Sequence, residues 1–285
     1  MAGFFCAYIL RVFKKQLHLC QNNTNQISKM SSYNSLLHKI ENAKPLEFSA
    51  IFDNVIELFK KVWLKGFLMV LIMVGFAIVV GVLFSLIGLA PKGNPFIDGF
   101  SLEIYAEFYS SSIIQNVPQT ILTTTITLAL VAAFYKMCIQ FDSGKTMVDD
   151  YFYFFKKEYF SKLLMLGIIH TGIATVAQLL FFVPYIYAFV PLAYFAIVFT
   201  NNPKLSEMEI VKASFALGNK KWLITFGTLF VAGILGFLGI LGCGIGILFT
   251  ISIVYLPTFF IYKAVVGFDD TSEIDLIGSH NDTNY

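Results

Sequence analysis

The histidines of this 285-residue chain do not form a metal or catalytic centre. His18, His38, His170 and His280 lie in four separate regions, and no two stand four residues apart. That spacing is the one by which a helix face presents two imidazoles to a zinc ion. Since no carboxylate accompanies His170, neither a non-haem iron centre nor a zinc hydrolase is supported. We therefore expect no metal and no cofactor.

Motifs for phosphate binding and nucleophilic catalysis are also missing from the sequence. Gly144-Lys145-Thr146 looks like the tail of a phosphate-binding loop, but Ile139 stands where that loop requires its first glycine. No Gly-x-Ser-x-Gly elbow is present. Four cysteines are too scattered for a metal knuckle, and we interpret them as free thiols: Cys6, Cys20, Cys138 and Cys243. These patterns favour a protein that is not an enzyme, without deciding the matter.

Two polar side chains remain as a candidate intramembrane site. His170 and Gln178 lie centrally in one long apolar stretch, eight residues apart and so roughly on one helix face. Polar groups inside a bilayer must find partners, and they often mark a path or a binding site. The simpler interpretation, which we favour, is hydrogen bonding between helices. Its candidate partners are Thr123, Thr124, Thr125 and Thr127.

Composition shows which kind of structure must position these residues. The chain is 57% apolar and only 13% charged, with a mean hydropathy of +0.72. So little polar surface cannot coat a soluble protein of this size, which excludes disordered, collagenous, disulfide-scaffold and soluble nucleic-acid-binding classes. The formal net charge of +2 points to no acidic partner. The composition is that of a protein embedded in a bilayer.

Six apolar stretches are long enough to cross a membrane. About 20 residues, at about 1.5 Å each, traverse the hydrocarbon core. The stretches are Phe67–Ala90, Val117–Ile139, Leu163–Val183, Pro184–Thr200, Leu223–Gly242 and Ile245–Ala264. The sequence therefore predicts an all-α, polytopic membrane helix bundle of three hairpins. Close packing of spans five and six is expected from their glycines, and breaks are expected at Pro184, Pro191 and Pro257.

The distribution of positive charge predicts the orientation. Of the 20 Lys and Arg residues, only Lys92 falls on the side opposite the chain ends. Because positive residues are retained in the cytoplasm, we expect both termini to be cytoplasmic and the protein to lie in a bacterial cytoplasmic (inner) membrane.

A similar segment precedes spans one, three and five. Residues 48–63, 147–159 and 208–222 each combine a helical pattern, a lysine pair and an aromatic residue. We predict three interfacial amphipathic helices, the last two opened by Thr146 with Asp149 and Ser206 with Glu209. The alternative is that they are ordinary cytoplasmic turns. The expected anchors to anionic lipid head groups are Lys60, Lys61, Trp63, Lys156, Lys157, Tyr159, Lys220, Lys221 and Trp222.

The chain accordingly divides into three parts. Residues 1–44 form a cytoplasmic N-terminal segment, in which 1–29 fits no targeting pattern and Met30 is the expected natural start. Residues 45–268 form the six-span domain of three pseudo-repeats, and residues 269–285 an acidic cytoplasmic tail. The outer connection 91–116 is expected to hold a surface helix, either as a lid or partner site or as a cover for helix ends.

The third repeat resembles a known family. The residues are Leu205-Ser-Glu-Met-Glu-Ile-Val-Lys-Ala-Ser-Phe-Ala-Leu-Gly-Asn-Lys-Lys-Trp-Leu-Ile-Thr-Phe226, Gly242-Cys-Gly-Ile-Gly246 and Tyr255-Leu-Pro257. They are similar to poorly characterised six-helix bacterial membrane proteins, including the membrane domain of some glycerophosphodiester phosphodiesterases. The resemblance covers about Leu46 to Phe268 and implies a fold and a location. It carries over no active-site residue, because the catalytic phosphodiesterase domain is absent.

Relatives in this group have been automatically named carotenoid-cleaving monooxygenases. Such oxygenases hold iron with four histidines on a β-propeller, and neither the strands nor the ligand set is found in this sequence.

The leading expectation is a non-enzymatic role in membrane or envelope organisation, or as a partner subunit. The alternatives are a small-molecule or lipid transporter or channel, favoured by a polar cavity joining His170 and Gln178 to solvent, and an integral-membrane enzyme. No Asp, Glu or Arg lies centrally in a span, which counts against an ion-coupled pump.

The predicted topology can be tested by labelling single cysteines on whole cells. In a background without the four native cysteines, Glu107→Cys should react with an impermeant maleimide, because its connection faces outward. Lys157→Cys should not react until the cells are lysed, because the lysine-rich connections stay in the cytoplasm. Labelling of intact cells at position 157 would contradict the six-span arrangement.

Overall fold

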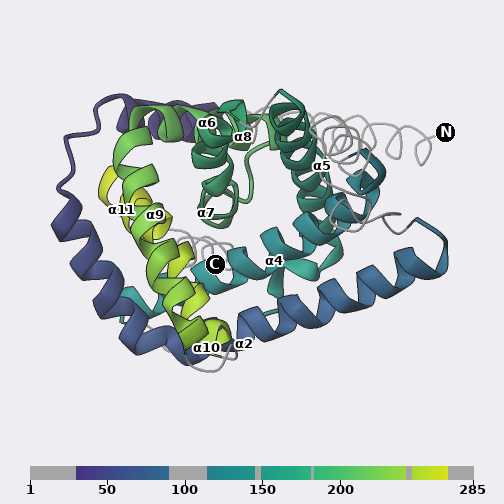
Figure 1. Ribbon diagram of the computed structural model, residues 1–285. Helices are drawn as coiled ribbons and strands as arrows, with labels where there is room; N and C mark the ends of the chain where they lie inside the picture. Colours follow the sequence, from purple (N-terminus) through teal and green to yellow (C-terminus); the bar gives the residue numbers. More distant parts are fainter. Residues whose placement is uncertain (1–29, 90–113, 145–148, 181–182, 242–245, 269–285) are drawn as a thin grey trace, which may run out of the picture.

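The computed structural model describes residues 30–89, 114–144, 149–180, 183–241 and 246–268 (Figure 1). Within these ranges the chain is helical and has no strand, which confirms the all-α fold. Six segments are long and apolar enough to cross a membrane, as predicted: Phe48–Leu86, Val117–Asp142, Lys157–Leu179, Val183–Asn201, Trp222–Leu241 and Gly246–Val265. The protein is therefore a multi-pass membrane protein in architecture. The segments 1–29 and 269–285, and most of the outer connection, lie outside the described residues.

The helices follow one another in three hairpins, preceded by a helical segment at 30–41. In chain order the elements are α2 (Phe48–Leu86), α4 (Val117–Asp142), η1 (Tyr153–Phe155), α5 (Lys157–Leu179), α6 (Val183–Ala193), α7 (Phe195–Asn201), α8 (Glu207–Lys220), α9 (Trp222–Leu238), η2 (Gly239–Leu241), α10 (Gly246–Thr250), η3 (Ile251–Tyr255) and α11 (Leu256–Val265).

The connections predicted to share one side of the membrane do lie together. Lys263 at the end of α11 pairs with Asp142 at the end of α4, at 2.6 Å. Lys65 of α2 pairs with Asp149, just before η1. Lys162 near the start of α5 donates to the Pro203 and Leu205 carbonyls after α7, at 2.6 and 2.7 Å. We call this end of the bundle, marked by residues 65, 142–162, 203–205 and 263, the lysine-rich end.

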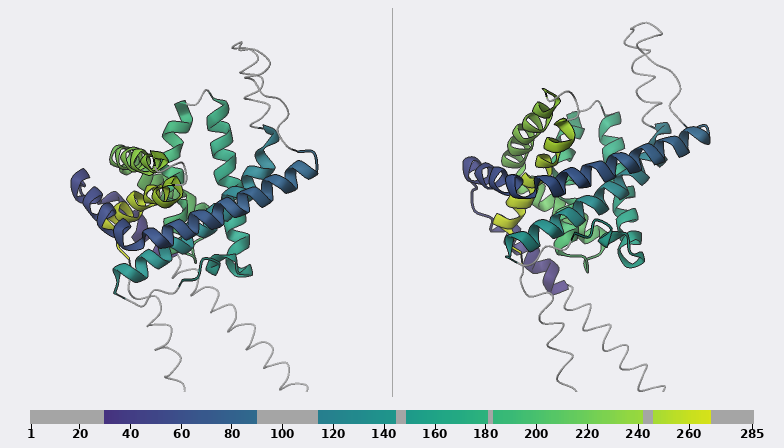
Figure 2. Two further views of the ribbon diagram at one scale, coloured as in Figure 1. Left: turned by 60° about the horizontal axis from the view of Figure 1, so that its bottom comes forward. Right: turned by 90° about the horizontal axis from the view of Figure 1, so that it is seen from below.

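The segment predicted to precede span one is continuous with it. α2 runs unbroken from Phe48 to Leu86, and Figures 1 and 2 show it changing direction part-way along. The predicted apolar face is present in its first part, but Ile51, Val55 and Val62 are buried inside the protein. This part of α2 is therefore held by packing against the bundle, whereas its polar face, with Glu57, is exposed.

The other two segments of this kind differ from each other. Before span three the described chain makes a turn and one short 3₁₀ helix, η1, which is shorter than the predicted amphipathic helix; Thr146 of its predicted cap lies outside the described residues. Before span five the prediction of a helix is confirmed, because α8 opens with a complete capping box. The Ser206 hydroxyl accepts from the Glu209 N–H, and the Glu209 carboxylate accepts from the Ser206 N–H at 2.7 Å. Ile210 and Leu217 of α8 are fully buried.

Span four is broken by a proline, as predicted. α6 ends at Ala193, two residues after Pro191, and α7 begins at Phe195. A proline removes the N–H that would bond the carbonyl four residues earlier. That carbonyl, of Tyr187, instead accepts the indole N–H of Trp222 at 3.1 Å. The carbonyl group that the break leaves free is thus hydrogen-bonded by α9, the first helix of the third hairpin.

Gly218 allows α8 to approach this break closely. A Cβ at this position would lie 2.6 Å from the Pro191 Cα, closer than real atoms come. The neighbouring atom belongs to the backbone and cannot rotate away, so any side chain here must push α8 from α6. By contrast, a Cβ at Gly233 of α9 would meet nothing within 4 Å.

We expect Gly218→Ala to destabilise the protein by about 1–3 kcal/mol, the usual cost of overpacking. Gly233→Ala is the matched control and should be neutral or stabilising by up to about 1 kcal/mol, because alanine favours the helix. Denaturant unfolding in detergent micelles measures both changes. Equal stability of the two variants would show that the α6–α8 contact is looser than described.

Candidate functional site

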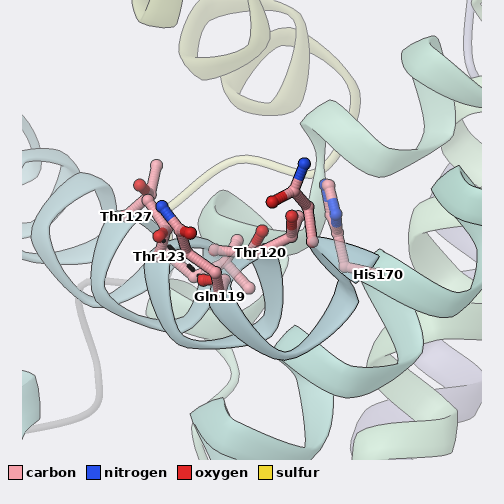
Figure 3. Close-up of a pocket in the computed structure, with 8 residues that line it drawn as sticks. Gln119, Thr120, Thr123, Thr127 and His170 are labelled. Atoms are coloured by element: carbon pink, nitrogen blue, oxygen red, sulfur yellow. Dashed lines mark hydrogen bonds between the residues drawn. The ribbon is translucent and has the colours of Figure 1, made fainter. Parts of the chain in front are cut away.

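A polar cavity lies beside the predicted residue His170. It has a volume of about 490 Å³, and its wall comes from the first half of α4 together with α5. Figure 3 shows the His170 ring standing beside a row of polar α4 side chains. The lining residues are Asn116, Gln119, Thr120, Thr123, Thr124, Thr127, Leu128 and His170.

The chemistry of this wall is neutral and hydrogen-bonding. None of the described lining residues carries a charge, and apart from Leu128 each offers a hydroxyl, amide or imidazole group. The Thr123 hydroxyl donates to the Gln119 carbonyl of its own helix at 2.8 Å. Its oxygen can still accept a further hydrogen bond. The cavity can therefore bind a group that both donates and accepts hydrogen bonds but has no net charge.

A close contact between α4 and α5 places His170 at the cavity. Gly167 lies so near Thr125 that a Cβ on the glycine would collide with the threonine side chain. One helical turn later, His170 faces the cavity and meets the edge of the Phe195 ring, with ring centroids 5.6 Å apart. Its Nδ1 atom is buried and has no hydrogen-bond partner. An unsatisfied buried nitrogen of this kind costs stability unless a ligand or water binds it.

The cavity occupies the half of the bundle away from the lysine-rich end. Thr127 and His170 each lie roughly four helical turns from that end, measured along α4 from Asp142 and along α5 from Lys157. Between the cavity and the lysine-rich end, α4 is tightly packed: Leu128 to Tyr135, Met137 and Cys138 are all buried. The cavity therefore ends near the middle of the bundle and does not continue through it.

The predicted polar site is brought together only in part. Thr123, Thr124 and Thr127 do line the same cavity as His170. Thr125 turns toward Gly167 instead, and its hydroxyl donates to its own helix at the Ile121 carbonyl, 2.8 Å away. Gln178 is half-buried and is not part of the cavity wall. It lies about 12 Å farther along α5 than His170.

Sequence reasoning missed three polar lining residues, Asn116, Gln119 and Thr120. Their signal was available: residues 116, 120, 123 and 127 are polar at helical spacing, which is a polar face within an otherwise apolar span. The row was overlooked because its residues are uncharged and single threonines in membrane helices normally bond to their own backbone.

Several predicted membrane anchors are exposed as a lipid contact requires. Lys60, Lys156, Lys157 and Lys220 are exposed. Lys61 is also exposed but pairs with Glu57 at 2.6 Å. The three predicted aromatic anchors meet protein groups. Trp63 packs on Phe249, Tyr159 stacks on Tyr153, and Trp222 bonds the Tyr187 carbonyl.

Lys221 differs from the other lysines of the predicted anchor set. Its side chain is buried, and its ammonium group donates to the carbonyls of Ala43 and Lys44. Burial, together with the neighbouring charge of Lys220, lowers the pKa of Lys221 below its usual value. In this structure the residue holds residues 43–44 against the start of α9, so it is positioned to fasten protein segments to each other.

The cavity predicts a difference in chemical access between neighbouring threonines. In a cysteine-free background, Thr120→Cys and Thr123→Cys should react with a charged, impermeant methanethiosulfonate at least about tenfold faster than Thr125→Cys, because reaction requires an accessible thiolate. Thr125 is the control, since it lies on the same helix but is fully buried. Equal reaction rates at the three positions would show that water does not enter the cavity.

Known proteins offer no assignment for this site. No family model matches the chain, and neither a curated protein nor a solved structure matches it. The function must therefore be argued from the chemistry of the cavity and from the charged end of the bundle.

Proposed function

We propose that this is a multi-pass protein of the bacterial cytoplasmic membrane with a non-enzymatic role in membrane or envelope organisation. In this role it binds, within the bilayer, the uncharged head group of a lipid. The observation that supports the proposal is the polar cavity beside His170, lined by hydroxyl and amide groups and ending at mid-bundle. A role as partner subunit fits the same binding site if the lipid positions a second protein.

The uncharged wall selects the type of group that can bind. An ionised head group would lose its hydration without gaining a counter-charge, and that desolvation is costly inside a membrane. A hydroxyl- or amide-bearing group can instead exchange hydrogen bonds with Thr123, Thr127 or Gln119. The volume of about 490 Å³ lies within the usual range for small-molecule sites.

The surroundings of the cavity favour a lipid over a free solute. Gly81 of α2 approaches the Gln119 amide to 3.8 Å, measured from an ideal Cβ position. On the same part of α2, Ile78, Val79 and Val82 are more than half exposed. This apolar surface can contact acyl chains while the head group occupies the cavity.

Anionic lipid head groups are the second proposed partner, at the opposite end of the bundle. Lys156 and Lys157 are exposed at the start of α5, Lys220 is exposed at the end of α8, and Lys60 is exposed within α2. Each such residue near an anionic surface contributes on the order of 1 kcal/mol. If the lysine-rich end is cytoplasmic, the charges of Lys156 and Lys157 face the anionic leaflet, and both chain termini lie in the cytoplasm.

A transporter or channel is the second candidate function, because the cavity carries polar groups from one end of α4 to the middle of the bundle. The buried, mostly apolar stretch Leu128–Cys138 closes the remaining path, so transport would require a second conformation. An integral-membrane enzyme is the third candidate, and it would gain support from a metal or lipid bound at His170.

The proposal is tested by native mass spectrometry of the detergent-purified protein with monoglucosyl-diacylglycerol as the neutral lipid. Thr123→Leu combined with Thr127→Leu fills the cavity and removes two hydroxyls. We expect it to weaken binding roughly thirtyfold, since each of the two lost hydrogen bonds contributes about 1 kcal/mol. Thr175→Leu, the same change on α5 outside the cavity wall, should bind like the unmodified protein.

Unchanged binding by the double variant would overturn the proposed site. Solute flux across proteoliposomes that disappears with the same double substitution, without selective lipid binding, would favour the transporter instead.

A further inference from the structure

Two lysines converge on a single tyrosine ring at the lysine-rich end. The Lys136 ammonium lies 3.1 Å from the centre of the Tyr153 ring, and the Lys156 ammonium lies 4.5 Å from the same centre. Lys136 comes from the last turns of α4, Tyr153 from η1 and Lys156 from the residue before α5. Two segments of the chain, the last turns of α4 and the junction of η1 with α5, therefore bring two positive charges to one ring.

The tyrosine ring is held in place by its neighbours. It stacks on Tyr159 with centroids 5.7 Å apart and meets Phe154 edge to face at 4.9 Å. Phe154 is almost fully buried and packs in turn on Phe199 of α7. A ring fixed in this way supports both ammonium groups by cation–π attraction.

The carboxylates of the neighbouring connection are engaged elsewhere. Asp142 pairs with Lys263, Asp149 pairs with Lys65, and Asp150 accepts the N–H of Phe152 at 3.1 Å. Glu158 interacts with Tyr159. Among the described residues, no carboxylate lies within salt-bridge distance of Lys136 or Lys156. Their two charges therefore repel each other without a compensating anion.

The local electrostatics favour negative charge. Burial raises the pKa of Tyr153, but Lys136, Tyr159 and Lys156 act in the opposite direction and together bring the pKa below its usual value. A site that stabilises a phenolate stabilises other oxyanions for the same reason, since the cause is the field of the two ammonium groups.

We propose that Lys136, Tyr153 and Lys156 form a discrete binding site for the phosphate group of an anionic phospholipid. The site deepens the proposed contact with anionic lipid and rests on that part of the proposed function. Both ammonium groups lie within 4.5 Å of the centre of one ring, so each can donate to an oxygen of a phosphate group bound beside that ring. Charge-assisted bonds of this type are stronger than those between neutral groups.

A lipid phosphate fits the position better than a free phosphate does. Lys136 belongs to an apolar span whose neighbouring residues Tyr135 and Met137 are buried, so its ammonium reaches the end of the bundle on a long apolar stem. Phe152, beside the tyrosine, is half exposed, and Phe141 is also exposed. Apolar and positively charged surface therefore meet at one place, as an acyl chain and its phosphate require.

Native mass spectrometry with 1-palmitoyl-2-oleoyl-phosphatidylglycerol measures the site directly. Lys136→Gln combined with Lys156→Gln should weaken the first binding step roughly tenfold to a hundredfold, because two charge-assisted bonds are lost. Lys204→Gln combined with Lys212→Gln removes the same charge from exposed lysines outside the site and should change binding less than about twofold. Tyr153→Phe should keep the affinity, whereas Tyr153→Leu should reduce it, because only the first keeps the ring.

Further outcomes of the same binding measurements separate the competing explanations. Equal losses in the two lysine pairs would overturn the discrete site in favour of diffuse attraction to the whole end. Tight binding of inorganic phosphate or glycerol phosphate, abolished by the Lys136 and Lys156 changes, would assign the site to a soluble phosphate instead. The variant in which Thr123 and Thr127 are replaced by leucine should bind phosphatidylglycerol like the unmodified protein. The result at Lys136 and Lys156 therefore does not depend on whether the neutral-lipid site exists. Thermal unfolding of each variant identifies any loss caused by misfolding.

Discussion

The indole N–H of Trp222 bonds the carbonyl that Pro191 leaves free in span four, and the rest of the bundle depends on constraints of this kind. Inside hydrocarbon no water can satisfy a backbone group, so each irregular turn needs a donor from another helix. The Tyr135 hydroxyl likewise donates to a backbone carbonyl of another span, that of Tyr255, where η3 passes into α11, at 2.8 Å. Such bonds tie the irregular spans four and six to α9 and α4. Regular helices supply the donors, and broken helices supply the acceptors.

The six spans could be predicted from sequence because apolar length is a local property, read from about 20 residues at a time. The capping box at Ser206 was equally local. The continuity of α2 through residue 62 was not, because Val55 and Val62 suit a membrane surface and a protein interior equally well. His170 was recognisable as a polar residue in an apolar span. Its position beside the α4 threonines depends on the contact of Gly167 with Thr125, which involves two helices and is not visible in either one alone.

The two ends of the bundle differ in the way they handle polarity. On one side, α4 presents neutral hydroxyl and amide groups to a cavity that stops at Leu128. On the other, the charges lie near the ends of α4 and α11, on α2 and in the connections, on lysines and the carboxylates that pair with some of them. A neutral group can lie deep in the bilayer at moderate cost, whereas a charge must stay near its boundary. This difference in depth is the physical basis for assigning neutral and anionic lipids to opposite ends.

The bond from Lys221 to Ala43 and Lys44 has a consequence for the order of assembly. Ala43 and Lys44 lie 178 and 177 residues before Lys221 in the chain. The ribosome must therefore deliver the first four spans and α8 before this contact can form. Until then the helical segment at 30–41 lacks this fastening. Docking of the N-terminal segment is consequently a late step of biogenesis. It can be completed only after the third hairpin has begun to enter the bundle.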